Sequence, residues 1–322
     1  MIKKVSVISL FLLLISLSSC SKPSINENLF AMDTVMSFSL KGENAKECLS
    51  EIESEIIRLE NIFSVNKQDS EISKINSSTD AVYVCSDTAN IIKKATEISA
   101  LTDGAFDISI YPLVKLWGFT EKDFKVPTDD QIAQVIKSTD YKKIEIDDNK
   151  IRFDGQIDLG GIAKGYACDK ISKILKKHNI EEAIISLGGN ILIKGNQKTV
   201  GIAHPNKSDE LICTLKATNT SIVTSGGYQR NFSQDGKIYH HILDPKTGKP
   251  AQSGIISATI ICDNSTLADG LSTAVYIMGT DKAIKFWKEN QNFDMIIIDN
   301  QNIYATVPVE VTDKTFKLNI IE

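Results

Sequence analysis

The order of hydrophobic periods along the 322-residue chain is the feature that most constrains its fold. Residues 34–40 alternate apolar side chains with serines, which is the period of a half-buried strand. Residues 52–63 then repeat large apolar side chains every three or four positions, which is the period of an amphipathic helix. Strand-like and helix-like segments continue to follow each other to the C-terminus without an internal repeat. The sequence therefore predicts an α+β fold.

Further helices are expected at 88–101, from a capping box at Thr128 and Gln131, and from Ile162. The remaining expected strands are 143–147, 150–154, a strand ending at Leu159, 183–187, 191–195, 199–203, 211–217, 221–225, 237–243, 255–262, 295–299, 303–306 and 316–320. Two more helices are expected at 266–279 and 281–291.

The N-terminus is typical of an export signal. Two lysines precede an apolar run, residues 5–17, that is too short to span a bilayer. The run ends in Leu-Ser-Ser-Cys, which resembles the lipobox of bacterial lipoproteins and makes Cys20 the expected site of lipid modification. We expect 1–19 to be a signal peptide and 20–29 to be the lipid anchor and a polar tether, with ordinary secretion as the alternative. The mature protein would be extracytoplasmic and lipid-anchored to a bacterial membrane, on its periplasmic side or at the cell surface.

Charge and cysteine content argue against several classes of protein. The formal net charge of −5 argues against binding nucleic acid, and against charge-driven binding to anionic lipids. Beyond the lipobox, the cysteines are odd in number and show neither CxxC nor metal-ligand spacing. We therefore expect free thiols, mostly buried as small apolar side chains, at Cys48, Cys85, Cys168, Cys213 and Cys262.

Within residues 157–165, two adjacent glycines at 160 and 161 precede an expected helix start that carries a lysine. Lys164 would lie in the first turn, where the helix dipole is already positive. A bound anion would explain this placement, because glycines let backbone N–H groups approach phosphate oxygens and lysine adds a charge. The spacing is neither GxGxxG nor that of a P-loop, so a tight structural turn is the alternative.

A carboxylate and a hydroxyl lie one turn apart in the expected helix 266–279. Asp269 and Thr273 have the i, i+4 spacing that places both on one helix face. Together they could hold a hard cation such as Mg²⁺, whose remaining ligands would be phosphate and water. A hydrogen bond between the two side chains on a solvated face is the alternative.

Eight sequence blocks follow each other in an order typical of one family. The blocks are MDTVMSF, FSVNKQDSEISKIN, TDGAFDISIYPLVKLWGF, IDLGGIAKGYACD, ISLGGNILIKG, TSGGYQRNF, YHHILDPKTGKP and LADGLSTAVYIMG. They resemble the signature blocks of the ApbE-type FAD:protein FMN transferases, and the resemblance makes 30–322 the expected transferase domain. It implies T-fold-like mixed sheets with flanking helices, and FAD held in a cleft between the halves.

The resemblance also implies a reaction. A Mg²⁺-dependent enzyme of this family cleaves FAD, attaches FMN through a phosphoester to a threonine or serine of a target protein, and releases AMP. FAD would be the substrate, and the acceptors would be proteins of membrane or extracytoplasmic electron-transfer complexes. A Mg²⁺-dependent FAD pyrophosphatase and a non-catalytic FAD-binding lipoprotein are the alternatives.

Site residues are carried over from the family by position. The metal ligands would be Asp269, Thr273 and the carbonyl of Gly161. The FAD contacts would be Met32, Asn66, Ala105, Phe106 and Asp107 (the last three on the adenine side), Asp158 and Lys164.

The chain departs from the family pattern at three positions. Asn66 stands where many members have tyrosine, which puts the balance between transfer and hydrolysis in question. Asp33 stands where glycine is common, and Gly270 where alanine is common.

Two adjacent histidines precede an Asp-Pro-Lys-Thr-Gly turn. In the family the second of them recurs, so His241 is the candidate general base that takes the proton of the acceptor hydroxyl. His240 would point to the opposite face of an extended segment. A structural role for His241, bonded to its own loop, is the alternative, and His178 and His204 are expected at the surface or in turns.

Overall fold

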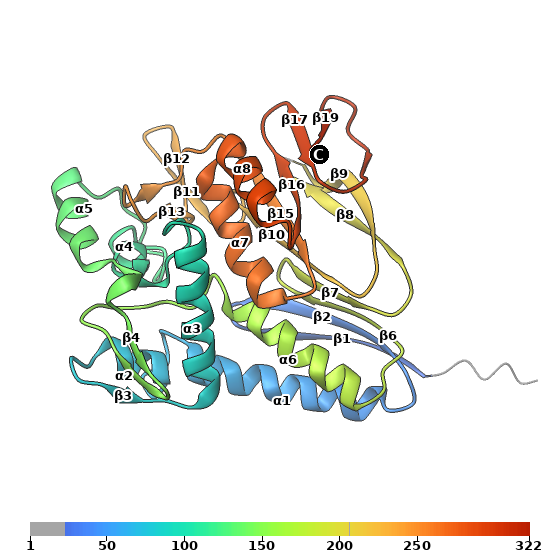
Figure 1. Cartoon of the computed structure of the whole chain (residues 1–322), viewed down its shortest axis with the longest axis horizontal. Helices are drawn as coiled ribbons and strands as arrows, with labels where there is room; N and C mark the ends of the chain where they lie inside the picture. Colours follow the sequence, from blue (N-terminus) through green and yellow to red (C-terminus); the bar gives the residue numbers. More distant parts are fainter. Residues whose placement is uncertain (1–22, 206) are drawn as a thin grey trace, which may run out of the picture.

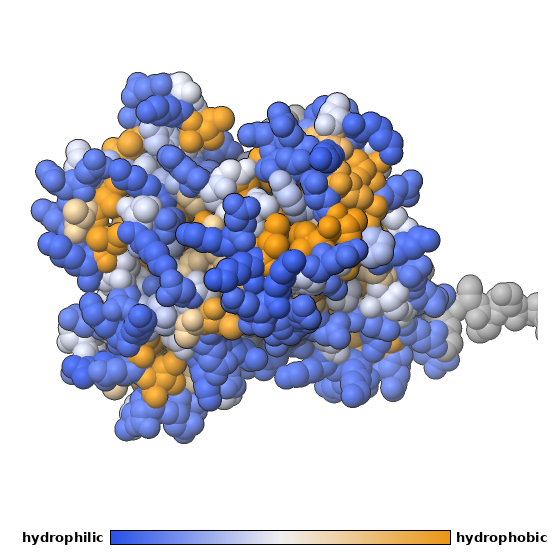
Figure 2. Space-filling view, turned by 45° about the horizontal axis from the view of Figure 1, so that its top comes forward, coloured by the Kyte–Doolittle hydropathy of each residue, from blue (hydrophilic) through white to orange (hydrophobic). Residues whose placement is uncertain are grey.

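The structure is a computed structural model that describes residues 23–205 and 207–322 (Figure 1). The expected signal peptide and Cys20 lie outside these residues. Within the described ranges, no helix is both long enough and apolar enough to cross a membrane. Figure 2 shows a face on which hydrophilic residues predominate and apolar patches are scattered.

A nine-stranded sheet is the centre of the fold. Its strands, in spatial order, are β1 (Ser24–Ala31), β2 (Thr34–Lys41), β6 (Glu182–Leu187), β7 (Asn190–Lys194), β10 (Ser221–Gly226), β15 (Ser257–Cys262), β16 (Asp294–Ile298), β17 (Asn302–Ala305) and β19 (Lys317–Ile320). Neighbouring strands are antiparallel, except that β17 and β19 are parallel. The prediction of an α+β fold with a mixed sheet is confirmed.

Helices and a smaller sheet cover the two faces of this sheet (Figure 1). In the part of the chain that the structure describes, the larger of the two cores beside this sheet is built with five long helices. They are α1 (Ala45–Phe63), α3 (Ser86–Leu101), α6 (Ala163–Lys177), α7 (Ser265–Met278) and α8 (Thr280–Asn290). The smaller sheet is β8 (Lys198–His204), β9 (Lys207–Ala217) and β18 (Glu310–Val311).

Strand β16 shows how the two cores share the sheet. Met295 and Ile297 lie in the core under the helices, and Ile296 and Ile298 lie in the core under the small sheet. A strand that is buried on both faces needs apolar residues at every position, which explains its continuous apolar run.

A third apolar cluster lies beside the main body. It contains α4 (Tyr111–Leu116), α5 (Asp129–Val135) and the hairpins β11 (Asn231–Gln234) with β12 (Lys237–His240) and β13 (Leu243–Asp244) with β14 (Lys249–Pro250). The other short elements are α2 (Glu71–Asn76), β3 (Val82–Tyr83), β4 (Glu145–Asp147), β5 (Lys150–Arg152) and 3-10 turns at Ile108–Ile110, Ile136–Ser138 and Tyr141–Lys143. The capping box expected at the start of α5 is present.

Several expectations about elements are wrong. The tether predicted over 20–29 is strand from Ser24 onward, because β1 pairs with β2 along its whole length. The strand predicted to end at Leu159 does not form. Instead, the side-chain amide of Asn76 bonds the carbonyl of Ile157 at 2.9 Å and accepts from its N–H at 2.7 Å. A side chain thus replaces the neighbouring strand that this segment would need.

The predicted strand 237–243 is interrupted between His240 and Leu243, so His241 lies just beyond the end of β12. His204 is the last residue of β8, directly before the turn to β9, which agrees with its expected place at a turn. It is only 7 % exposed and lies 3.4 Å from the carboxylate of Asp313, so its placement at the surface is wrong. His178 is half-buried at the C-terminal end of α6 and lies 2.7 Å from Glu51.

The cysteines that the structure describes are free thiols, as expected. Three of the five, Cys48, Cys168 and Cys213, are buried in the apolar cores.

Candidate functional site

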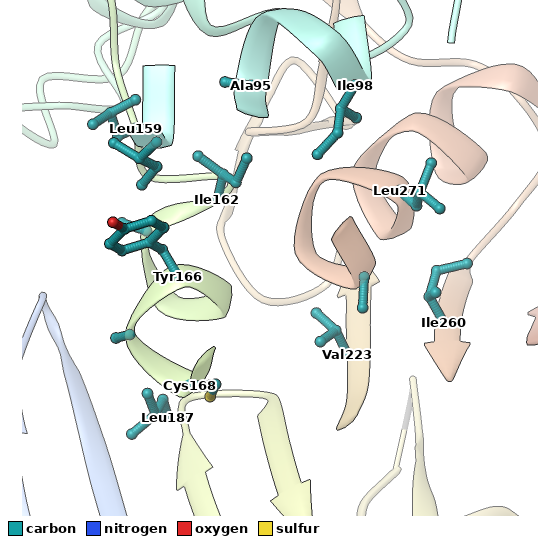
Figure 3. Close-up of a cluster of buried hydrophobic side chains, with 14 of the residues drawn as sticks. Ala95, Ile98, Leu159, Ile162, Tyr166, Cys168, Leu187, Val223, Ile260 and Leu271 are labelled. Carbon is teal, nitrogen blue, oxygen red and sulfur yellow. The ribbon is translucent and has the colours of Figure 1, made fainter. Parts of the chain in front are cut away.

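Helices α6 and α7 cross at a glycine, and this crossing carries the predicted phosphate and metal residues. A Cβ atom at Gly165 would lie 2.3 Å from the carbonyl oxygen of Ser265, so only glycine permits this approach. Asp169 of α6 accepts hydrogen bonds from the backbone N–H groups of Ser265 and Thr266 at 2.9 and 3.0 Å. A carboxylate of one helix thus caps the other at its positive end. Figure 3 shows buried apolar side chains of α3, α6 and α7 together with neighbours from the central sheet, such as Val223 and Ile260.

The crossing fixes Asp269. Its side chain is only 5 % exposed, and Oδ2 accepts a hydrogen bond from the N–H of Gly165 at 2.8 Å. Burial raises the pKa of Asp269 above its ordinary value, while the charge of Lys164 and the Gly165 N–H oppose the rise. The side chain of Asn190 also lowers the pKa of this carboxyl. The Asn190 amide nitrogen is nevertheless buried and makes no hydrogen bond of good geometry among the described residues.

Thr273 and Gly161 lie on the same side of the crossing. The hydroxyl oxygens of Thr273 and Ser225 are 3.3 Å apart. A Cβ at Gly161 would lie 4.0 Å from the hydroxyl oxygen of Thr273. No hydrogen bond joins Asp269 to Thr273 in the part of the chain described, and Asp269 is buried. The alternative of a hydrogen-bonded pair on a solvated face is therefore wrong.

The donor set fits a hard divalent cation. A carboxylate, a hydroxyl and a main-chain carbonyl are the oxygen ligands that Mg²⁺ accepts, with phosphate and water completing the shell. No cluster of three or more histidine, cysteine or acidic side chains suited to a metal occurs among the described residues. The residues present therefore suit a cation that is shared with a bound phosphate rather than a fully protein-ligated one.

Lys164 supplies the positive charge at the start of α6. Its Nζ donates to the carbonyl of Gly188 at 3.3 Å, in the tight turn between β6 and β7. The N–H groups of Ile162 and Ala163 both bond the carbonyl of Leu159, at 2.9 and 2.8 Å. Because these helix-terminal donors are already used, attraction for an anion at this end rests mainly on the Lys164 side chain.

Asp158 and the adenine-side segment flank the loop before α6. Oδ1 of Asp158 accepts from the N–H of Gly160 at 2.8 Å, and burial raises the pKa of this carboxyl. Ala105 and Phe106 are buried, and the Phe106 ring would be 3.2 Å from a Cβ at Gly161. Asp107 accepts from the backbone N–H and the hydroxyl of Ser109, both at 2.7 Å. It starts a 3-10 turn, and its contact with FAD stays a prediction.

Met32 lies at the opposite edge of this region, in the turn between β1 and β2. Met32 and Asp33 have φ angles of 49° and 59°, the left-handed values of a two-residue hairpin turn. Asp33 forms an ion pair with Arg230. Next to this turn, Thr34 packs on Gly188, whose carbonyl accepts from Lys164. Met32 is thereby joined to the lysine side of the site, whereas the exposed Asn66 makes no hydrogen bond or ion pair with it among the described residues.

His241 directly follows β12 of the hairpin, and the charge of Lys164 acts on its ring. Its Nδ1 lies 3.1 Å from the carbonyl of Arg230. The pKa of His241 is lowered to about 4, mainly by burial and in addition by the charges of Arg230, His240 and Lys164, against the effect of that hydrogen bond. His241 is therefore neutral near pH 7, the state that a general base requires.

His240 has different neighbours from His241. Its Nε2 lies 3.0 Å from the carbonyl of Ala251, and its ring packs edge-on against Tyr276. These contacts place His240 in the packing against α7, and the difference in role between the two histidines stays a prediction.

The sequence reading did not identify Gly188, Asn190, Ser225 or Arg230 as parts of this region. The blocks ISLGGN and TSGGYQR contained them, but no spacing in one sequence indicates which residues of a turn will face another turn. A groove of about 640 Å³ between Cys262, Trp287 and Phe293 lies elsewhere, and none of the predicted FAD contacts lines it.

An α+β fold that gathers a lysine, a buried aspartate, a hydroxyl and a neutral histidine defines a protein suited to bind and cleave a phosphate compound. The chain belongs to the ApbE family, whose sequence profile matches residues 32–297.

Named relatives agree with this assignment. The chain is similar to proteins named FAD:protein FMN transferase from Klebsiella pneumoniae and Haemophilus influenzae. The first is 33% identical and covers 79% of this chain and 83% of the relative, and the second is 31% identical and covers 76% of each. Two solved structures are also similar. The ApbE protein of Thermotoga maritima gives a TM-score of 0.81 at 32% identity (90% of this chain, 97% of that one), and the flavin transferase ApbE of Vibrio cholerae gives 0.78 at 27% (88% and 97%). The resemblance inferred from the eight blocks is confirmed.

Proposed function

We propose that the protein is a Mg²⁺-dependent FAD:protein FMN transferase that attaches FMN to a threonine or serine of an acceptor protein and releases AMP. Family membership and the names of the relatives support the class of reaction. The observation that carries the proposal is a series of contacts that joins the cation-binding and proton-accepting groups. Gly165, which follows Lys164, donates to Asp269. Lys164 donates to Gly188, on which Thr34 packs. The neighbouring Asp33 pairs with Arg230, whose carbonyl holds His241.

The residues of the chain divide the reaction between them. The neutral Nε2 of His241 accepts the proton of the acceptor hydroxyl, and the hydroxyl oxygen attacks the phosphorus on the FMN side of the FAD pyrophosphate. A phosphoester bond forms as the bond to the AMP phosphate breaks, and the electron pair leaves with AMP. The imidazolium then releases its proton to water.

Charge that develops on the phosphate oxygens is met by Lys164 and by fixed donors at the helix crossing. Asp269, Thr273 and the Gly161 carbonyl would hold Mg²⁺, which when bound supplies Lewis-acid stabilisation of the pyrophosphate oxygens. The buried, glycine-enforced crossing keeps these oxygen donors in place before substrate binds.

The acceptors and the location remain part of the proposal. The lipobox-like segment ending at Cys20 supports an extracytoplasmic enzyme anchored by lipid to a bacterial membrane. Acceptors in membrane or extracytoplasmic electron-transfer complexes would be within reach of such an anchor.

Intact-mass analysis tests the proposed reaction. An acceptor fragment that carries a target threonine is incubated with the soluble domain, FAD and Mg²⁺. The expected result is a mass gain equal to one FMN, lost on adding a chelator and in His241→Ala. No adduct together with accumulating FMN and AMP would overturn the transferase in favour of the pyrophosphatase.

Asn66 is the observation that keeps the pyrophosphatase as a second candidate. It is exposed in the turn after α1, where many family members have tyrosine. Incubation with FAD and Mg²⁺ but without acceptor measures the hydrolysis rate. If Asn66→Tyr lowers that rate and leaves transfer intact, the residue sets the balance between water and the acceptor hydroxyl.

A further inference from the structure

An ion pair joins two turns that are far apart in the sequence. Asp33, in the turn between β1 and β2, binds the guanidinium of Arg230, which follows β10. The side chains are 59% and 52% exposed, so the pair lies at the surface. Exposed pairs of this kind contribute little to stability, at most about 1 kcal/mol. A role in stabilising the fold does not account for it well.

The main chain of Arg230 holds the candidate base. Its carbonyl oxygen accepts from the backbone N–H of His241 at 3.1 Å and lies 3.1 Å from Nδ1 of the same residue. Because a carbonyl can only accept, Nδ1 must carry the hydrogen in the neutral ring. The lone pair is then on Nε2, which makes no hydrogen bond within the described residues. One carbonyl therefore fixes both the ring orientation and the tautomer.

We propose that Arg230 and Asp33 form a positioning pair for His241, in which the Arg230 carbonyl orients the imidazole and Asp33 anchors Arg230 from the opposite turn. The inference rests on the proposed function, since it assumes that His241 is the base. The inference also explains why aspartate stands at position 33, where glycine is common in the family. Aspartate tolerates the left-handed backbone of this turn, with φ of 59°, and adds a carboxylate that glycine lacks.

The pair also sets the electrostatic surroundings of His241. The charged or titratable groups that act on the ring are Arg230, His240 and Lys164, and the ring of Phe119 packs edge-on against it. Asp33 partly offsets the charge of Arg230. Removing the carboxylate should therefore make protonation of His241 harder, and removing the guanidinium should make it easier.

Opposite shifts separate this role from a merely structural one. Loosening the turn would affect Asp33→Asn and Arg230→Gln in the same direction, because both break the same ion pair. Electrostatic coupling instead lowers the pKa of His241 in Asp33→Asn and raises it in Arg230→Gln, by about 0.3 pH units each at low salt.

Nitrogen-15 NMR of the histidine rings measures the tautomer and the titration. The chain has four histidines, and His241→Asn assigns the signal of interest. Asp235→Asn is the matched control, because Asp235 is also an exposed aspartate in a left-handed hairpin turn, with φ of 51°. The expected results are an Nδ1–H tautomer in the parent protein, opposite shifts in the two pair variants and no shift in the control.

Kinetics complete the test. Both pair variants should lower kcat for FMN transfer about threefold to tenfold, because the base is misplaced. KM for FAD should stay within twofold, because the groups that bind FAD are unchanged. An Nε2–H tautomer, shifts of the same sign or no shift would overturn the inference. The titration needs no acceptor, so a protein that fails to transfer FMN would refute the proposed function while the NMR shifts still decide the pairing.

Discussion

The two sides of the candidate site are built differently. At the helix crossing, Asp269 is buried, Gly165 enforces close contact, and Asp169 caps the neighbouring helix. On the hairpin side, His241 is held by one carbonyl and by a turn anchored through an exposed ion pair. Stabilising charge on a breaking pyrophosphate favours groups that are fixed in advance, whereas receiving a protein substrate requires an accessible base. The contrast indicates that rigidity is placed where charge develops and accessibility where the acceptor arrives.

The largest effect is expected at the rigid side. Asp269→Asn keeps an oxygen that can accept from the Gly165 N–H but removes the charge that would hold Mg²⁺. Transfer should fall by about 10²–10³-fold, the range seen when one preorganised charge-stabilising group is lost. Initial rates at saturating FAD and Mg²⁺ measure this, with exposed Asp263→Asn as the control. A loss below tenfold would remove Asp269 from the metal site.

The next largest effect concerns the crossing itself. Gly165→Ala places a methyl group 2.3 Å from a backbone oxygen, which cannot move as a flexible side chain could. We expect a loss of about 3 kcal/mol in the free energy of unfolding, measured by urea titration, together with a loss of transfer. Ser172→Ala, at an exposed position of the same helix, is the control. An unchanged urea midpoint would show that the two helices can separate without cost.

A smaller effect is expected in the pH dependence of kcat/KM, which the protonation of His241 sets. The pKa of His241 lies at about 4, below the ordinary 6.5, so the neutral base persists as the pH falls until it passes through that value. The acid limb of kcat/KM for FAD, which reports the free enzyme, should therefore lie well below pH 6. A limb centred near pH 6.5 would contradict the lowering of this pKa by partial burial and by the neighbouring positive charges.

The smallest effect lies in the packing behind the site. A Cβ at Gly270 would lie 3.0 Å from Ile98 Cδ1, so Ile98 fills the space that an alanine methyl group at position 270 would need. Removing a methyl group in Ile98→Val should make room, and Gly270→Ala in that background should raise the stability of α7 by about 0.5–1 kcal/mol. Thermal unfolding of the two single variants and the double variant checks this. Equal melting temperatures for Ile98→Val and the double variant would argue against the packing explanation.

Periodic segments of the fold could be predicted from the sequence, and long-range choices could not. The alternation in β2 and the helical spacing in α1 were sufficient, because each segment buries one face. The strand predicted before Leu159 failed because Asn76, 81 residues before Ile157, replaces its partner strand. The tether prediction failed because polar residues 24–29 belong to an edge strand, where solvent-facing side chains are allowed.

The site was predictable to the extent that family blocks carried it. Lys164, Asp269 and His241 were identified by position, and the charge of Lys164 reaches both of the others. The partners that orient them, such as Gly188 and Arg230, come from turns whose meeting depends on sheet order. That order places β10 between β7 and β15, which no local pattern in one sequence specifies.

Calorimetric titration of FAD into three proteins tests the division of labour most directly. The parent, Asp269→Asn and His241→Ala are each measured with and without Mg²⁺. The expected result is that His241→Ala binds FAD like the parent yet transfers no FMN, whereas Asp269→Asn loses about tenfold or more of the Mg²⁺-dependent affinity. If His241→Ala lost FAD binding as Asp269→Asn does, or if Asp269→Asn kept its Mg²⁺-dependent affinity, the two sides would not divide the reaction as described.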